Sequence, residues 1–84
     1  MSVQNLKESD FTCEVIKVLR SQPVDAKNRM DLRVVKWKRS ARPVLEKRRI
    51  WLTKEGERPS KMAGLDLDDV KFIFEHHAEL INLL

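Results

Sequence analysis

The sequence predicts an α+β domain with the element order β-β-β-β-α. Short runs rich in Val, Ile and Phe, each followed by turn residues, occupy the chain up to residue 65 and indicate strands. After that point the apolar residues recur at helical spacing. A length of 84 residues with 42% hydrophobic content fits one domain, residues 1–84, in which residues 1–9 are expected to be a flexible N-terminal tail.

Four strands are expected before the helix. They cover residues 11–20 (FTCEVIKVLR), 32–39 (LRVVKWKR), 44–52 (VLEKRRIWL) and 61–65. A loop is expected to begin near Pro23 after the first run, and Pro43 closes the second run because proline lacks the amide donor that a sheet needs. Gly56 lies in a hairpin turn, where a glycine can take the left-handed backbone conformation.

The C-terminal stretch predicts one amphipathic helix. Asp68 is expected to be its N-cap, with Leu67 packing onto Phe72 as a hydrophobic staple. Apolar residues lie on more of this helix than one sheet face can cover, so we expect a homodimer. The side chains expected at the subunit interface are Phe72, Ile81, Leu83 and Leu84.

The composition narrows the classes of protein to consider. No apolar run approaches the roughly 20 residues of a membrane helix, and the first ten residues lack the apolar core of a signal peptide. A soluble, intracellular protein with no membrane partner is therefore expected. The single cysteine, Cys13, has no partner for an internal disulfide and is expected to be a buried thiol.

The net charge of +4 is unevenly distributed along the chain. Nine basic and two acidic residues lie within residues 29–51, a net charge of +7, whereas residues 65–84 carry a net charge of −4. A basic segment in a folded domain indicates an anionic partner, although a solvated charged face would also account for it.

Strand alternation places tryptophans beside cations in two of the expected strands. One face of residues 44–52 carries Lys47, Arg49 and Trp51, and one face of residues 32–39 carries Arg33, Trp37 and Arg39. If odd positions pair with odd positions, both tryptophans share one face, which suits base stacking and phosphate neutralisation on a single strand. The alternative is that both tryptophans belong to the core. Arg48, on the other face, is expected near Glu75 or Glu79 of the helix.

No residue pattern indicates catalysis or a cofactor. His76 and His77 are adjacent on the expected helix, so their side chains point about 100° apart and cannot share one metal ion. His77 is expected to be buried and His76 exposed. Phosphate-binding glycine loops and zinc-ligand spacings are absent from the sequence, and we expect neither a metal nor an enzyme.

Several short motifs resemble the transcriptional coactivator family of positive cofactor 4. They are Trp51, Glu55-Gly56-Glu57, the stretch from Gly64 to Leu67, Asp68 as the cap and Phe72 in the first helical turn. The chain departs from the family where Met62 and Ala63 replace basic residues before Gly64, so Arg58 and Lys61 are the nearest cations. As a compact chain it is more similar to the bacterial and phage members.

The resemblance implies a curved antiparallel sheet that dimerises to form basic channels for single-stranded DNA. Trp51 would stack on bases, and Trp37 occupies the place of an aromatic residue on the second strand. The residues implied or expected to line the channel are Arg33, Trp37, Arg39, Lys47, Arg49, Trp51, Arg58 and Lys61.

The expected function is single-stranded DNA binding with little sequence preference, in transcription, replication or recombination. Proteins of those processes are candidate partners beside a second copy of the chain. Two alternatives stay open, namely an RNA-binding module that uses the same sheet and a scaffold subunit with an acidic protein partner.

Overall fold

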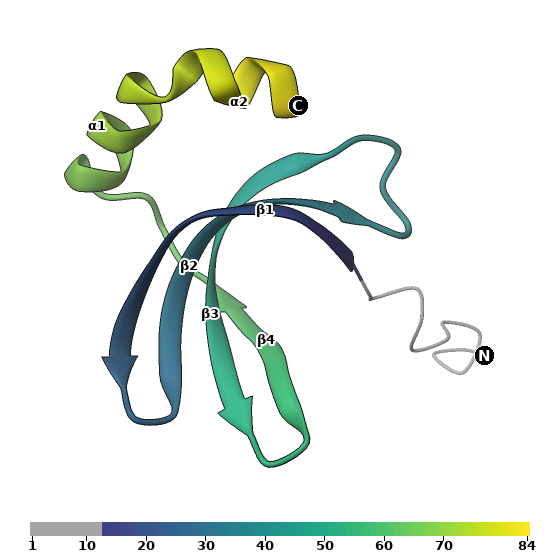
Figure 1. The fold of residues 1–84 in the computed structure, drawn as a ribbon, viewed down its shortest axis with the longest axis vertical. Helices are drawn as coiled ribbons and strands as arrows, with labels where there is room; N and C mark the ends of the chain where they lie inside the picture. Colours follow the sequence, from purple (N-terminus) through teal and green to yellow (C-terminus); the bar gives the residue numbers. More distant parts are fainter. Residues whose placement is uncertain (1–12) are drawn as a thin grey trace.

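The computed structural model describes residues 13–84, and the tail expected at residues 1–9 lies outside the described residues. Four strands precede two helices (Figure 1). The elements are β1 (Cys13–Asp25), β2 (Asn28–Trp37), β3 (Val44–Thr53), β4 (Gly56–Met62), α1 (Leu67–Glu75) and α2 (His77–Leu83). The α+β class is confirmed. The expectation of one C-terminal helix is wrong, because the helical stretch is interrupted at His76.

The sheet is antiparallel and its strands lie in chain order, β1-β2-β3-β4. The first hairpin is tighter than expected. β1 continues through Pro23 and turns within two residues, because the Asp25 carboxylate accepts the Lys27 backbone N–H at 2.8 Å. Pro23 is tolerated because β1 is an edge strand, which has a partner strand on one side only.

The second hairpin turn fixes where the last strand lies. Gly56 has φ of +121°, as its turn position favours, and the Thr53 hydroxyl donates to the Gly56 carbonyl oxygen at 2.7 Å. β4 therefore begins at Gly56 and ends at Met62, earlier than the expected run at residues 61–65.

The register of β2 against β3 decides which side chains share a face. Asn28 lies opposite Trp51, and Arg33 lies opposite Glu46, so odd positions pair with even positions. Cross-strand partners share a face, so the condition under which both tryptophans would share one face is not met. Trp37 and Trp51 consequently lie on opposite faces of the sheet.

We call the two surfaces of the sheet the helix-side face and the open face. Both helices lie on one side of the curved sheet (Figure 1), where α1 and α2 form ion pairs with Lys17, Arg20 and Lys47. By the register of β2 against β3, this helix-side face carries the side chains of Asn28, Met30, Leu32, Val34, Lys47, Arg49 and Trp51. The open face carries the side chains of Asp31, Arg33, Val35, Glu46, Arg48 and Ile50.

The core is small and is centred on β2. Leu32 and Val34 are buried on the helix-side face, and Leu80 of α2 is buried as well. Val35 and Ile50 are buried on the open face. Within residues 13–84, neither helix is long and apolar enough to cross a membrane.

The start of α1 is fastened to the sheet by Asp69. Asp66, rather than the expected Asp68, is the N-cap, and it forms a capping box with Asp69. The Asp69 side chain is 1% exposed and also accepts hydrogen bonds from Arg20 of β1 and Lys47 of β3. One buried carboxylate thus joins the helix to two strands.

The break between α1 and α2 occurs at His76 without a proline or glycine. A His76 ring nitrogen lies 2.9 Å from the Phe72 carbonyl oxygen, and the two rings stack at 4.0 Å between centroids. A side chain that bonds a helical carbonyl competes with the backbone ladder and bends the helix. The sequence has neither of these helix-breaking residues at the point where the helix is interrupted.

Candidate nucleic-acid interface

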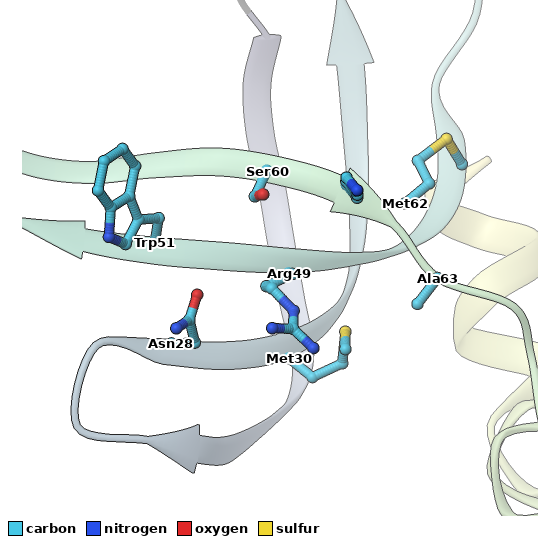
Figure 2. A pocket seen from close by; sticks show the side chains of 8 residues that line it. Asn28, Met30, Arg49, Trp51, Ser60, Met62 and Ala63 are labelled. Carbon is cyan, nitrogen blue, oxygen red and sulfur yellow. The ribbon is translucent and has the colours of Figure 1, made fainter.

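Four of the eight predicted binding residues lie together around Trp51. Its side chain is 51% exposed on the helix-side face, and Arg58 lies opposite it on β4. A pocket of about 520 Å³ adjoins the indole (Figure 2). It is lined by Asn28, Met30, Arg49, Trp51, Ser60, Lys61, Met62 and Ala63. We call Arg49, Trp51, Arg58 and Lys61 the Trp51 surface.

The cations of the Trp51 surface have no carboxylate in ion-pair contact within the described chain, although the charge of Arg49 helps to lower the pKa of Asp25. Across residues 13–84, Arg49, Arg58 and Lys61 form no salt bridge with a carboxylate. Their charges therefore remain available to an external anion, beside an aromatic ring that is open to stacking.

Two other predicted phosphate contacts form internal ion pairs. Lys47 lies 2.7 Å from the Asp69 carboxylate, and Arg33 lies 2.9 Å from Glu46. The hydrogen bond that Lys47 donates to the Asp69 carboxylate raises the pKa of Lys47. Since the side chains of Lys47 and Arg33 are only 12% and 6% exposed, they support the sheet rather than present charge to solvent.

Glu46 organises the open face. It accepts hydrogen bonds from Arg33, from Arg48 and, at 3.1 Å, from the Trp37 ring N–H. Burial would raise the pKa of Glu46, but the hydrogen bonds from Arg48, Arg33 and Trp37 outweigh it and lower that pKa. The Arg48 guanidinium also lies 5.1 Å from the Trp37 ring centroid. The expectation that Arg48 lies near Glu75 or Glu79 is wrong, because its strand position faces away from the helices.

The remaining two predicted residues, Trp37 and Arg39, are on the open-face side of the molecule. They line a hollow together with Arg48 and Pro59. The eight predicted residues thus separate into the Trp51 surface, the pair Trp37 and Arg39, and the internally paired Arg33 and Lys47. They do not form one continuous surface.

The predicted subunit-interface residues also divide. Ile81 is 71% exposed and Leu84 is exposed, whereas Phe72 and Leu83 are half-buried. The Phe72 ring stacks on His76 and lies 5.0 Å from the Arg20 guanidinium, so it belongs to the contact between helix and sheet. Val70 and Phe74, which is 75% exposed, continue the apolar stripe instead.

The histidines and the cysteine differ from expectation. His77 is exposed and His76 half-buried, the reverse of what was expected, because His76 bonds the Phe72 carbonyl. Cys13 is half-buried rather than buried, and burial raises its pKa. In the part of the chain that the structure describes, no group of three or more His, Cys, Asp or Glu is placed to hold a metal ion.

Three residues that were not predicted as site residues hold the neighbouring side chains in place. Glu46 and Asp69 each gather cations from two or more elements, and Asn28 lines the pocket beside Trp51. Glu46 is an isolated carboxylate in a basic strand, which is a signal for an internal ion pair. The basic partners of Glu46 could not be identified from the sequence, because they depend on the register of β2 against β3.

Comparisons with known proteins gave no assignment. No family model, no curated protein and no solved structure matches this chain.

Proposed function

We propose that this protein binds single-stranded DNA with little sequence preference, using the Trp51 surface. The observation that carries the proposal is the half-exposed indole of Trp51 among Arg49, Arg58 and Lys61, none of which forms a salt bridge within residues 13–84. An unpaired base stacks on the ring, and the cations neutralise the phosphates beside it.

The open face has a different role in this proposal. Trp37 and Arg48 are already engaged by Glu46, so a base would have to compete with those contacts. We therefore assign stacking to Trp51 and assign Trp37 to the support of β2 and β3. Arg39 remains a candidate phosphate contact at the rim of the open face.

We further propose that the protein acts as a homodimer inside cells, where transcription, replication and recombination expose single strands. The support is the outward apolar stripe on the helices, formed by Val70, Phe74, Ile81 and Leu84. A stripe of this kind is stabilised when a second copy covers it.

The test is a titration with three labelled ligands of equal length: single-stranded DNA, duplex DNA and single-stranded RNA. We expect single-stranded DNA to bind most tightly, with quenching of the tryptophan fluorescence. Trp51→Ala is the informative variant, and Lys71→Ala, on an exposed helix position, is the matched control.

Each of the other binding results would assign the protein to a different functional class. Preference for RNA would assign the same surface to RNA binding. Preference for the duplex would reject single-strand stacking, because paired bases cannot reach the ring. Binding to none of the three would reject the proposal and favour an acidic protein partner.

A further inference from the structure

Asn28 lies beside the Trp51 ring without being part of the Trp51 surface. The two residues are direct partners across β2 and β3 and line the same pocket. Figure 2 shows the Asn28 amide oxygen pointing toward β3, on the side of the sheet that carries the indole. A base stacked on Trp51 would bring its polar edge close to this amide.

The Asp25 carboxylate fixes which end of that amide faces the pocket. The Asn28 amide nitrogen lies 3.1 Å and 3.3 Å from the two Asp25 oxygens. Hydrogen bonds from the Lys27 backbone N–H and from Asn28 lower the pKa of Asp25, so the carboxylate is ionised at neutral pH. An ionised carboxylate only accepts hydrogen bonds, so the amide must turn its nitrogen toward it.

The consequence is an unused acceptor in the pocket. The Asn28 oxygen points away from Asp25, and no donor among residues 13–84 reaches it. Arg49 and Lys61, which line the same pocket, supply charge for phosphates but no acceptor. Asn28 therefore presents a fixed acceptor to a base edge beside the ring.

We propose that Asn28 selects, for the nucleotide stacked on Trp51, bases that carry an exocyclic amino group over bases that present a carbonyl oxygen there. The inference rests on the proposed function and adds a preference at one position of an otherwise nonspecific site. Cytosine and adenine donate an amino hydrogen to the Asn28 oxygen. Uracil and thymine carry a carbonyl oxygen in the place of the amino group. It would face the Asn28 oxygen with no hydrogen between the two acceptors.

The experiment compares oligo(dC) with oligo(dU) of equal length at pH 7.5. These bases have the same ring size and differ at C4, where an amino group replaces a carbonyl, and in the protonation of N3. We expect the parent protein to prefer oligo(dC) by about three- to tenfold, the equivalent of one net hydrogen bond. Asn28→Ala should bring the ratio of affinities close to one, while Asn82→Ala, on an exposed position of α2, should leave it unchanged.

A second variant tests the orientation and keeps the turn. In Asp25→Asn, the new side chain can accept from Lys27 with its oxygen and offer its nitrogen to Asn28. Asn28 would then turn its own nitrogen toward the pocket, and the preference should fall to one or reverse toward oligo(dU). A parent protein that binds both oligonucleotides equally overturns this inference alone. A parent protein that binds neither overturns the proposed function together with it.

Discussion

At the scale of single residues, the ring of Trp51 is half-exposed, so we expect its removal to affect DNA affinity much more than the stability of the fold. Little packing is lost when this side chain is truncated, but the stacking platform disappears. Stacking contributes about 1–3 kcal/mol per base, so Trp51→Ala should weaken single-strand affinity by roughly 5- to 150-fold. Fluorescence anisotropy measures the affinity, and thermal melting should change little.

Trp37→Ala is a second control for that substitution, because it removes the other tryptophan of the chain. It removes the ring N–H that Glu46 accepts at 3.1 Å and the surface under Arg48. We expect a loss of about 1–3 kcal/mol in the free energy of unfolding, with a small effect on affinity. The proposed site would be contradicted if Trp37→Ala lost affinity and kept its stability while Trp51→Ala lost stability and kept its affinity.

Asp69 predicts how stability depends on pH. Burial would raise the pKa of this carboxyl, but the hydrogen bonds from Lys47 and from the Asp66 backbone, with the charges of Lys47 and Arg20, lower it from 3.8 to about 2. A lowered pKa in the folded state stabilises the fold above the unfolded value. That contribution is lost as the pH falls from about 4 to about 2.

The measurement is a series of urea unfolding curves between pH 6 and pH 2. Asp69→Asn should lower stability at pH 6 and make the curve of stability against pH flatter below pH 4. If parent and variant differed by a constant amount over the whole series, Asp69 would not titrate in this window.

At the scale of elements, β3 assigns different roles to neighbouring cations. Arg49 lines the pocket and forms no salt bridge within residues 13–84, so Arg49→Ala should flatten the slope of log affinity against log salt by about 0.7. Lys47 pairs with the buried Asp69, so Lys47→Ala should leave the slope unchanged and lower the free energy of unfolding by about 1–3 kcal/mol.

Binding titrations at four or more salt concentrations and thermal melting of both variants check this assignment. A flattened slope for Lys47→Ala with normal stability would show that the Asp69 contact does not hold Lys47 in solution. The sheet would then present both cations to the phosphates.

At the scale of the whole molecule, the helices carry apolar surface that the single chain leaves exposed. Phe74 and Ile81 are 75% and 71% exposed. Ile81→Glu should shift the protein toward the monomer, because an unpaired carboxylate in an apolar interface costs several kcal/mol. Light scattering at micromolar concentration measures the shift, and Lys71→Glu is the control on α1. A monomeric parent protein would contradict the proposed dimer.

Much of the architecture could be predicted from the sequence because it depends on local patterns. Runs of β-branched residues indicated the strands, and Gly56 indicated the second hairpin turn. The spacing from Val70 onward indicated helix. The break at His76 could not be predicted, since it results from a hydrogen bond to Phe72 and not from a proline or glycine.

The candidate site was harder to predict because it depends on one pairing offset. Val35 opposite Val44 places Trp37 and Trp51 on different faces, and a shift by one residue would have reversed this. The residue types around Trp51 could be chosen from the sequence. The internal pairing of Arg33 and Lys47 could not, because their carboxylates come from other elements.

The chain-order sheet also has a consequence for folding kinetics. Every strand pairs with the next one along the chain, so each step closes a short loop and loses little entropy. The helices make their contacts with Lys17, Arg20 and Lys47 from the far end of the chain, which requires a late, long-range closure. We expect Asp69→Asn to accelerate unfolding in stopped-flow experiments while the refolding rate stays the same, the behaviour of a contact that forms after the transition state. A refolding rate slowed in proportion to the lost stability would instead place the docked helix inside the folding nucleus.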